Sequence, residues 1–299
     1  REQFLSRAPR IWDDWETFPG PQSITRNDCL HLTRARGFCV SFAIDAAPEH
    51  ATEYDNFAWV VPRYLAGAVP AWSPKTLQVV DGDVLRPIFA SDIPKGGHNL
   101  PFDGNITKST LGEYPVNLQI CTQIAHHLVN NHLGPRAHGL KRLSVLYSNY
   151  GRYDDPLDAW LIAHGYTDDE GKPDGGYIWL APDALVHLYN GTDACVPKHV
   201  WPQLEQKIRE ADLWEVFTGE RMPFALEYMH MDRTGLRVDE ARLMRLSDDL
   251  DLSKSLIETQ LAALAGHELN PNSPKQVQKY LFEARGLPIQ GWTAPGQPA

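Results

Sequence analysis

Three β-rich runs near the start of the chain constrain its fold more than any other feature. They lie at residues 10–15, 37–44 and 57–61, and turn-forming residues bound the last two. β-Branched and aromatic residues favour strands, and short runs of them separated by turns form antiparallel meanders. The sequence therefore predicts a sheet that begins with such a meander. Asp13 is an exception, because it falls on the face of the first strand that should be apolar.

Apolar residues at helical spacing dominate the middle of the chain. They predict helices at 83–91, 116–132, 138–150 and 182–193, with a short strand at 96–99. The stretch 151–176 is polar, rich in Asp, Gly and Pro, and without a clear period, which predicts an excursion on the surface. We expect Pro197 to break or kink the last helix, because its ring clashes with the carbonyl four residues back, that of Asp193.

After residues 218–223 the sequence predicts only helices. The elements predicted there are helices at 224–231, 239–266 and 273–286. Asp239 has the position of an N-cap, and the helix that follows carries its leucines in a single stripe. Ser273 to Gln276 reads as a capping box with proline at the first helical position. The sequence thus predicts an α/β part followed by a helical part.

The tetrapeptide Asp14-Trp15-Glu16-Thr17 places two carboxylates on one face of the first strand, because alternate side chains of a strand project to the same side. Two carboxylates held a few ångströms apart repel each other, so one takes up a proton unless a cation binds between them. A hard divalent cation resolves that conflict. A solvated strand end is the alternative interpretation, since so short a pattern also arises by chance.

Composition limits the classes of protein to which the chain can belong. Its 299 residues, 42% of them hydrophobic, suffice for one large domain or two ordinary ones. The net charge of −10 argues against a generally basic nucleic-acid coat but leaves room for a local positive cleft.

The four cysteines form no CxxC pair, which predicts reduced and mostly buried thiols. No apolar run approaches the roughly 20 residues that span a bilayer, and we expect no membrane partner.

Two further patterns complete an ordered set with the first. NxxFD stands at residues 99–103 and YxxxD at residues 189–193. In order and spacing, DxE, NxxFD and YxxxD resemble the three exonuclease motifs of the 3′-to-5′ proofreading exonucleases. The tail, with RTGLRVD at 233–239 and LAALAGHELNPNSPKQVQKYLFEARGLP at 261–288, is similar to the start of the polymerase region in family A DNA polymerases, the bacterial polymerase I type and its phage relatives.

The resemblance implies a fold and a division into domains. Residues 1–222 are expected to form an RNase H-like exonuclease domain of the α/β class, a mixed sheet flanked by helices. Residues 223–299 are expected to form the start of the polymerase domain, a truncated base of the thumb. The polymerase motifs do not occur in these residues, and the first residue is Arg1, so we interpret the chain as part of a longer polymerase and do not expect it to copy DNA by itself.

The resemblance also implies the site. Asp14, Glu16 and Asp193 would hold a first metal ion, with Asp14 bridging to a second ion that Asp103 supports. Hard oxygen ligands suit two Mg²⁺ or Mn²⁺ ions, which clamp a scissile phosphate when they lie about 3.5–4 Å apart. Tyr189 would orient the attacking water, because a phenol with a pKa near 10 is a poor base at neutral pH.

Further residues are candidates for contact with the substrate. Thr17 follows Glu16 directly, and Asn99 would position the substrate or the loop of Asp103. Phe102 is a candidate for stacking on a terminal base, with core packing as its alternative. Lys275 and Lys279 lie one helical turn apart and could contact backbone phosphate, with a solvated face as the alternative.

The leading hypothesis is a two-metal-ion 3′-5′ exonuclease that removes nucleotides from a single-stranded or frayed DNA 3′ end, as the proofreading part of a DNA-directed DNA polymerase in DNA replication. A catalytically silent, exonuclease-like DNA-binding module and an RNA-trimming 3′-5′ exonuclease are the alternatives. The partners expected are DNA, as a single-stranded 3′ end or a primer-template, and the remainder of the polymerase chain, while accessory replication proteins stay open. The expected location is cytoplasmic, in a bacterial or phage-infected cell, with an organelle as the other possibility.

Overall fold

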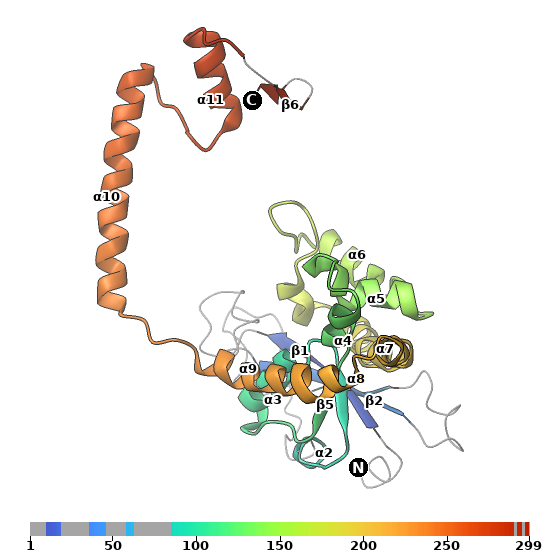
Figure 1. Cartoon of the computed structure of the whole chain (residues 1–299). Coiled ribbons are helices and arrows are strands. Elements are labelled where there is room, and N and C mark those ends of the chain that lie inside the picture. The colour runs from blue at the N-terminus through green and yellow to red at the C-terminus, as the bar shows by residue number, and fades with distance from the viewer. Residues whose placement is uncertain are drawn as a thin grey trace. The chain divides into compact units, whose positions relative to one another are not determined.

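The computed structural model describes residues 10–18, 36–45, 58–62, 85–289, 292–294 and 297–298. The chain divides into two compact units, Arg1–Gly235 and Leu236–Ala299 (Figure 1). The family resemblance predicts a domain boundary at 222/223 instead. That assignment of an exonuclease and a thumb region stays a prediction, whereas the division between compact units falls at Gly235.

A mixed sheet of five described strands forms the centre of the first unit. The strands are β1 (Arg10–Phe18), β2 (Arg36–Asp45), β3 (Ala58–Pro62), β4 (Lys95–Gly97) and β5 (Leu118–Cys121), in the order β3-β2-β1-β4-β5. β1 and β3 pair with β2 in antiparallel register, so the predicted meander is confirmed. β4 pairs in parallel with both β1 and β5. The predicted α/β class with a mixed sheet is also confirmed.

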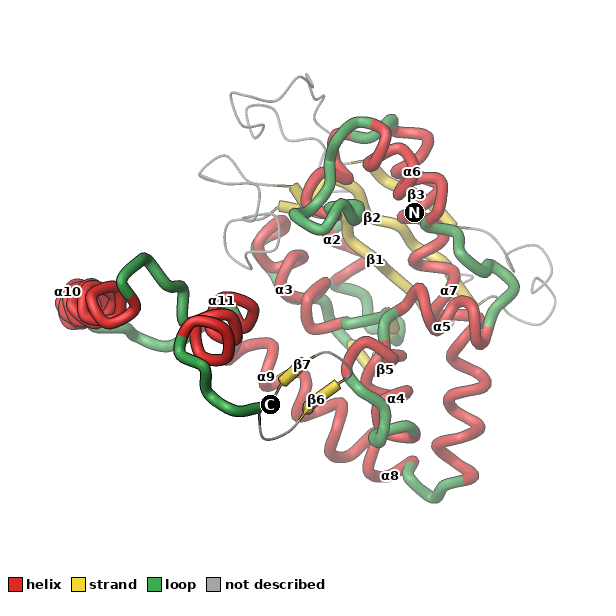
Figure 2. The backbone as a smooth tube through the Cα atoms, turned by 90° about the horizontal axis from the view of Figure 1, so that it is seen from above, coloured by secondary structure: helices red, strands yellow, loops and turns green. Residues whose placement is uncertain are grey.

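Helices cover both faces of this sheet (Figures 1 and 2). They are α2 (Arg86–Phe89), α3 (Leu100–Leu111), α4 (Thr122–Val129), α5 (Leu140–Tyr147), α6 (Asp155–Ala163), α7 (Asp183–Glu210), α8 (Trp214–Val216) and α9 (Met222–Thr234). Ile11 and Trp15 of β1 pack in one core cluster with residues of α2 and α3. Trp12 packs in a second cluster with residues of α4, α5 and α7. Because side chains alternate along a strand, Asp14 and Glu16 share the α7 side of β1 with Trp12.

The helix predicted at 116–132 is wrong in its first part. Residues 118–121 form strand β5, and helix α4 begins only at Thr122. Leu118 and Ile120 are buried while Gln119 between them is exposed, so this segment has the period of a strand. Pairing with β4, a tertiary contact, overrides the helical spacing of Leu118 with Ile124.

The surface excursion predicted at 151–176 contains a helix, α6. Leu157 and Leu161, four residues apart, are both buried and join a core cluster with Trp179 and Val186. Two apolar residues one turn apart suffice for a helix once a core receives them, although they are too few for a periodic signal.

Of the break or kink predicted at Pro197, the break is wrong, and the kink stays a prediction. Helix α7 continues for 28 residues through both Pro197 and Pro202, and Pro182 is its N-cap and not a residue of its first turn. Val196, Val200 and Trp201 on either side of these prolines are buried in the core. Packing of this apolar side against β1 and β2 offsets the ~3 kcal/mol that an internal proline costs a helix.

The second unit contains α10 (Glu240–Ala265), α11 (Pro274–Gln278) and the short strands β6 (Trp292–Ala294) and β7 (Gln297–Pro298). The predicted cap is confirmed, because the Asp239 side chain accepts a hydrogen bond from the Arg242 amide at 3.0 Å. The capping box is wrong: Ser273 makes no side-chain cap bond among the described residues, and the Gln276 side chain accepts from the Asn270 amide instead. The leucine stripe of α10 is exposed except at Leu261, which is half-buried, and none of the described residues of this helix is buried.

Two remaining expectations concern cysteines and membranes. Cys39, Cys121 and Cys195 are buried as predicted, and Cys29 lies outside the described residues. Among the helices that the structure describes, none combines the length and the apolar character needed to cross a bilayer.

Candidate active site

Three carboxylates converge between strand β1 and helix α7. One oxygen from each of Asp14, Glu16 and Asp193 lies within 4.8 Å of the other two. Asp14 is half-buried, whereas Glu16 and Asp193 are buried. Asp14 and Glu16 come from alternate positions of one strand, and the packing of α7 over β1 and β2 brings Asp193 to them. The first and third sequence patterns therefore meet in one cluster.

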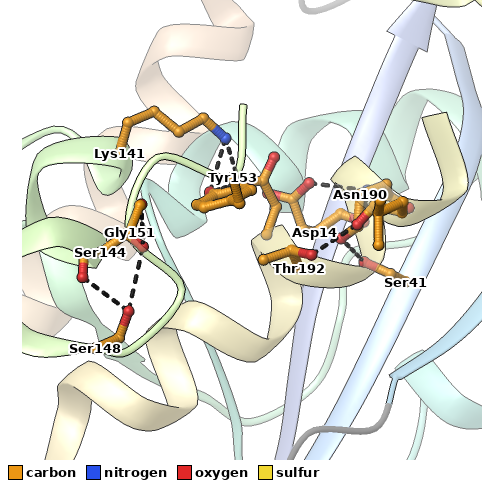
Figure 3. Close-up of polar contacts among 11 residues, drawn as sticks. Asp14, Ser41, Lys141, Ser144, Ser148, Gly151, Tyr153, Asn190 and Thr192 are labelled. Atoms are coloured by element: carbon orange, nitrogen blue, oxygen red, sulfur yellow. Dashed lines mark hydrogen bonds and ion pairs between the residues drawn. The ribbon is translucent and has the colours of Figure 1, made fainter. Parts of the chain in front are cut away.

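A buried amide holds Asp14 in place. The Asn190 Nδ2 donates to Asp14 Oδ2 at 2.9 Å and to the Asp14 carbonyl at 3.2 Å (Figure 3). Asn190 is itself fixed, because its carbonyl accepts from Ser41 Oγ at 2.6 Å and its Oδ1 accepts from Cys39 Sγ at 3.2 Å. Since Asn190 is fully buried, this support is rigid and carries no net charge.

A cation and a phenol hold Asp193. Lys141 Nζ, from α5, and Tyr153 OH both donate to Asp193 Oδ1. Lys141 Nζ also donates to Tyr153 OH at 2.8 Å (Figure 3). It lies 4.0 Å from the centre of the Tyr189 ring. Tyr189 and Asp193 are one turn apart on α7, so the ammonium contacts both residues of the YxxxD pattern.

Burial and mutual repulsion raise the pKa values of the acids. Burial raises the pKa of Asp14 well above its usual range, and the charges of Asp193, Asp103 and Glu16 raise it further while Lys141 opposes them. Burial, followed by Asp193, raises the pKa of Glu16 to about 8. Both shifts have the cause expected of carboxylates that share one site. A bound divalent cation would favour the ionised forms instead.

Asp103 comes to the site from the start of α3. Its Oδ1 accepts a hydrogen bond from the Trp15 amide at 3.1 Å, beyond the point where β4 stops pairing with β1. Asp103 is buried, and burial followed by the charge of Asp13 raises its pKa well above the usual range. It is not one of the three acids that meet within 4.8 Å, but its charge raises the pKa of Asp14.

The phenol of Tyr189 is half-buried under the Lys141 ammonium. Burial raises the pKa of Tyr189 well above 10, and the charges of Asp193 and Glu16 raise it further. Tyr189 therefore keeps its proton at neutral pH, which suits a hydrogen-bond donor and excludes a general base.

The residues predicted to contact substrate lie in three places. Thr17 is half-buried beside Glu16 on β1. Asn99, with a φ of 58°, is exposed just before α3 and lines a cavity of about 620 Å³ together with Phe102, Phe224 and Tyr228. Lys275 and Lys279 are exposed in the second unit, and their contact with DNA stays a prediction.

Sequence reasoning missed Asn190, Lys141 and Tyr153. Asn190 follows Tyr189 directly, but a buried amide has no signature in a single sequence. Lys141 and Tyr153 lie 52 and 40 residues before Asp193 in segments without a motif. Only the packing of α5 and the segment after it against α7 brings them to the site.

The donor set indicates the kind of cation that fits. All three clustered ligands are carboxylates, and such oxygen donors suit Mg²⁺ or Mn²⁺ better than Zn²⁺. Burial and then the neighbouring carboxylates raise the pKa values of Asp14 and Glu16, and a bound divalent cation would oppose both effects. The residues therefore fit a hard divalent ion.

Comparison with known proteins identifies relatives of the chain. No protein-family model matches it. DNA polymerase DpoZ of Salmonella phage PMBT28 is 29% identical over 214 residues, which cover 68% of this chain and 33% of that protein. DNA polymerase I of Bacillus subtilis is 35% identical over 134 residues, 44% of this chain and 15% of that protein. The chain thus spans a third or less of these curated relatives, and the predicted resemblance to polymerase I-type DNA polymerases is confirmed.

Solved structures share the fold. The POL domain of Pol1 from M. smegmatis, in complex with a DNA primer-template and dNTP, has a TM-score of 0.62 and 18% identity, covering 99% of this chain and 41% of that one. An apo form of a nuclease has a TM-score of 0.50 and 18% identity, covering 78% of this chain and 89% of its own. At these identities the likeness concerns the fold alone.

Proposed function

We propose that this chain contains the 3′-to-5′ exonuclease of a polymerase I-type DNA polymerase, and that it hydrolyses the terminal phosphodiester of a single-stranded or frayed DNA 3′ end. The observation that carries the proposal is the convergence of Asp14, Glu16 and Asp193 in one buried group of oxygen donors. The relatives, which are DNA polymerases, support DNA as the substrate and the rest of a polymerase chain as the partner.

Asp14, Glu16 and Asp193 would hold one divalent ion, with Asp14 bridging to a second that Asp103 supports. Bound there, such ions supply a hydroxide nucleophile and stabilise the leaving 3′ oxygen. Asn190 fixes the rotamer of Asp14 for this task. Tyr189, which stays protonated, orients the attacking water by hydrogen bonding.

The cavity beside α3 suits the end of a single strand. Asn99 and Phe102 line it, and Phe102 precedes Asp103 directly. Phe224 and Tyr228 add exposed aromatic faces, whose rings stack 6.4 Å apart. Unpaired bases stack on such faces without a sequence preference, so we assign this cavity to the last nucleotides of the strand. Thr17 is assigned to the phosphate next to the carboxylates.

A silent DNA-binding module is disfavoured by the same cluster. Burying several carboxylates together costs free energy, which their raised pKa values record. A module that only bound DNA, a polyanion, would gain nothing from acids at its binding site. An RNA-trimming enzyme is disfavoured because the relatives are DNA polymerases.

The test is degradation of a 5′-labelled single-stranded DNA oligonucleotide with Mg²⁺ or Mn²⁺. We expect a ladder that shortens one nucleotide at a time, that a chelator abolishes, and that the Asp14→Asn/Glu16→Gln double variant does not produce. The Glu205→Gln variant, which changes a half-buried acid of α7 that pairs with Arg209 instead of the cluster, is the matched control and should produce the ladder.

Three results would contradict the proposal. DNA binding without cleavage by either metal would indicate the silent module. Faster cleavage of an RNA oligonucleotide of the same sequence would indicate the RNA-trimming enzyme. Release of the labelled 5′ nucleotide in the first turnover would reverse the polarity.

A further inference from the structure

Lys141 occupies a position that a metal ion would also seek. Its ammonium contacts Oδ1 of Asp193, and Asp193 is one of the three acids that each bring a carboxylate oxygen within 4.8 Å of the other two. Its charge lowers the pKa of both Asp14 and Glu16, so it partly neutralises all three acids. No other lysine or arginine of the described residues makes an ion pair with this cluster. The ammonium is thus a cation of the site that belongs to the protein.

A divalent ion at the cluster would conflict with this contact. The ion needs the lone pairs of Asp193, and Oδ1 already accepts from both Lys141 and Tyr153. Two cations that share one carboxylate oxygen also repel each other strongly, because Coulomb energies are large at contact distance in a partly buried site. A divalent ion bound to Asp193 would therefore favour departure of the ammonium from this carboxylate.

The surroundings of Lys141 allow that movement. Its side chain is 35% exposed, whereas that of Asp193 is 5% exposed, so the cation can leave and the acid cannot. The cation also lies 4.4 Å from the Tyr153 ring centre and 4.0 Å from that of Tyr189, and these faces can keep it nearby. A second cavity is lined by Lys141 and Asp154, together with Arg142 and Arg152, so the ammonium borders open space that holds one acid and two further cations.

We propose that Lys141 is a tethered counter-ion that competes with the divalent cation for Asp193 and is displaced when that cation binds. The inference rests on the proposed metal site. It makes Lys141 a positioning residue that acts on catalysis through Asp193. At low metal concentration, the Lys141 ammonium then neutralises part of the negative charge of the three acids. The affinity of the site for a divalent cation is therefore lower than it would be without Lys141.

The experiment is a titration with Mn²⁺, followed by isothermal calorimetry and by the loss of the free-ion electron paramagnetic resonance signal. The proteins are the unmodified chain, Lys141→Met, Lys141→Arg and Lys207→Met. Lys207 is the matched control, because it also contacts a tyrosine ring, at 4.6 Å, but makes no ion pair with a described carboxylate.

We expect Lys141→Met to bind Mn²⁺ about tenfold more tightly, since an opposite charge at contact changes the proton affinity of a carboxylate by about that factor or more. Lys141→Arg keeps the charge and should stay closer to the unmodified chain, and Lys207→Met should match it. Weaker binding in Lys141→Met would show that Lys141 only organises Asp193, and unchanged binding would show a bystander. Either result overturns the inference and leaves the proposed function standing.

Failure of the metal site itself would look different. If neither the unmodified chain nor Lys141→Met binds Mn²⁺, the proposed function loses its metal and the inference falls with it. If only Lys141→Met binds, the competition is stronger than expected and the inference is supported.

A second measurement needs no variant. The chain is treated with an amine-reactive ester with and without Mg²⁺, and modification of each lysine is quantified by mass spectrometry. We expect Mg²⁺ to increase the modification of Lys141 severalfold and to leave that of Lys207 unchanged. Equal modification of Lys141 under both conditions would overturn the displacement.

Discussion

The two sides of the acidic cluster are supported in opposite ways. On the strand side, Asp14 accepts hydrogen bonds from the amide of Asn190, which is neutral, fully buried and itself held by Ser41. On the helix side, Asp193 is held by Lys141, a charged and partly exposed side chain, and by Tyr153. A neutral buried donor fixes a ligand without competing with a cation, whereas a charged exposed donor competes and can leave. The strand side is therefore the fixed half of the site and the helix side the adjustable half.

The largest effect is expected from removing the charge of the fixed half. Asp14→Asn keeps the shape of the side chain but deprives the proposed site of its bridging ligand. Metal ions contribute several kcal/mol to such reactions, so we expect cleavage of single-stranded DNA to fall by about a thousandfold or more. Initial rates on the 5′-labelled oligonucleotide measure the loss.

Asp13→Asn is the matched control for that variant. Asp13 is the preceding residue of β1, buried on the opposite face, and burial raises its pKa to about 7. It makes no hydrogen bond to the three clustered acids among the described residues, and its only stated effect on the site is that its charge raises the pKa of Asp103, so we expect most of the activity to remain. Equal losses in both variants would mean that the fixed half is a structural feature of the strand.

A smaller effect is expected from removing the support of the fixed half. Asn190→Ala deletes the donor to Asp14 and leaves the acid in place. Loss of a residue that orients a metal ligand typically costs about 10–100-fold in metal affinity or activity. We expect a loss of that size in the Mn²⁺ titration, opposite in sign to the effect of Lys141→Met. Thr192→Ala, which deletes a hydroxyl of α7 that donates to the Leu188 carbonyl, should leave the affinity unchanged.

The sequence predicts local structure and patterned ligands better than it predicts packing. The β1–β3 meander and the Asp239 cap follow from a few neighbouring residues, and both are confirmed. The strand β5 and the unbroken helix α7 depend on partners far along the chain, and both were missed. Propensity is a weak prior that burial and pairing override at such places.

The two halves of the site differ in the same way. The patterns DxE and YxxxD name Asp14, Glu16 and Asp193, which the structure brings together, although their roles stay proposals. Lys141 and Tyr153 were not predicted, because α5 and the segment that follows it carry no motif and reach Asp193 only through packing on α7. In this sequence, the proposed metal ligands belong to recognisable motifs, whereas the residues that hold those ligands in place do not.

The pH dependence of the free energy of unfolding tests whether the carboxylates of the cluster are protonated when no metal is bound. In the folded chain without added metal the pKa of Glu16 is about 8, against an ordinary value of 4.5, so the folded state binds a proton that the unfolded state releases between these values. The free energy of unfolding should therefore fall as pH rises from 4.5 to 8, by at most about 1.4 kcal/mol per pH unit for this group. Urea unfolding at pH 6 and 8.5 in a chelator measures the slope.

Mg²⁺ should reverse this loss, because metal binds the ionised carboxylates. We expect saturating Mg²⁺ to raise the free energy of unfolding more at pH 8.5 than at pH 6. Glu16→Gln should flatten the slope that is measured in the chelator. If Glu16→Gln leaves the change of unfolding free energy with pH unaltered, a group other than Glu16 causes that pH dependence.

The smallest effect is expected at the adjustable half, from Tyr153→Phe. The substitution removes the hydroxyl that donates to Asp193 but keeps the ring, which lies 4.4 Å from Lys141 Nζ. Because Lys141 still contacts Asp193, no carboxylate is left without a partner, and the expected loss is about 1–2 kcal/mol of unfolding free energy in urea. Tyr166→Phe, at a ring that stacks on Tyr177, is the control and should cost less. If Tyr153→Phe lowers the Mn²⁺ affinity as much as Asn190→Ala does in the same titration, the division is contradicted, because the phenol would then hold Asp193 as firmly as the amide holds Asp14.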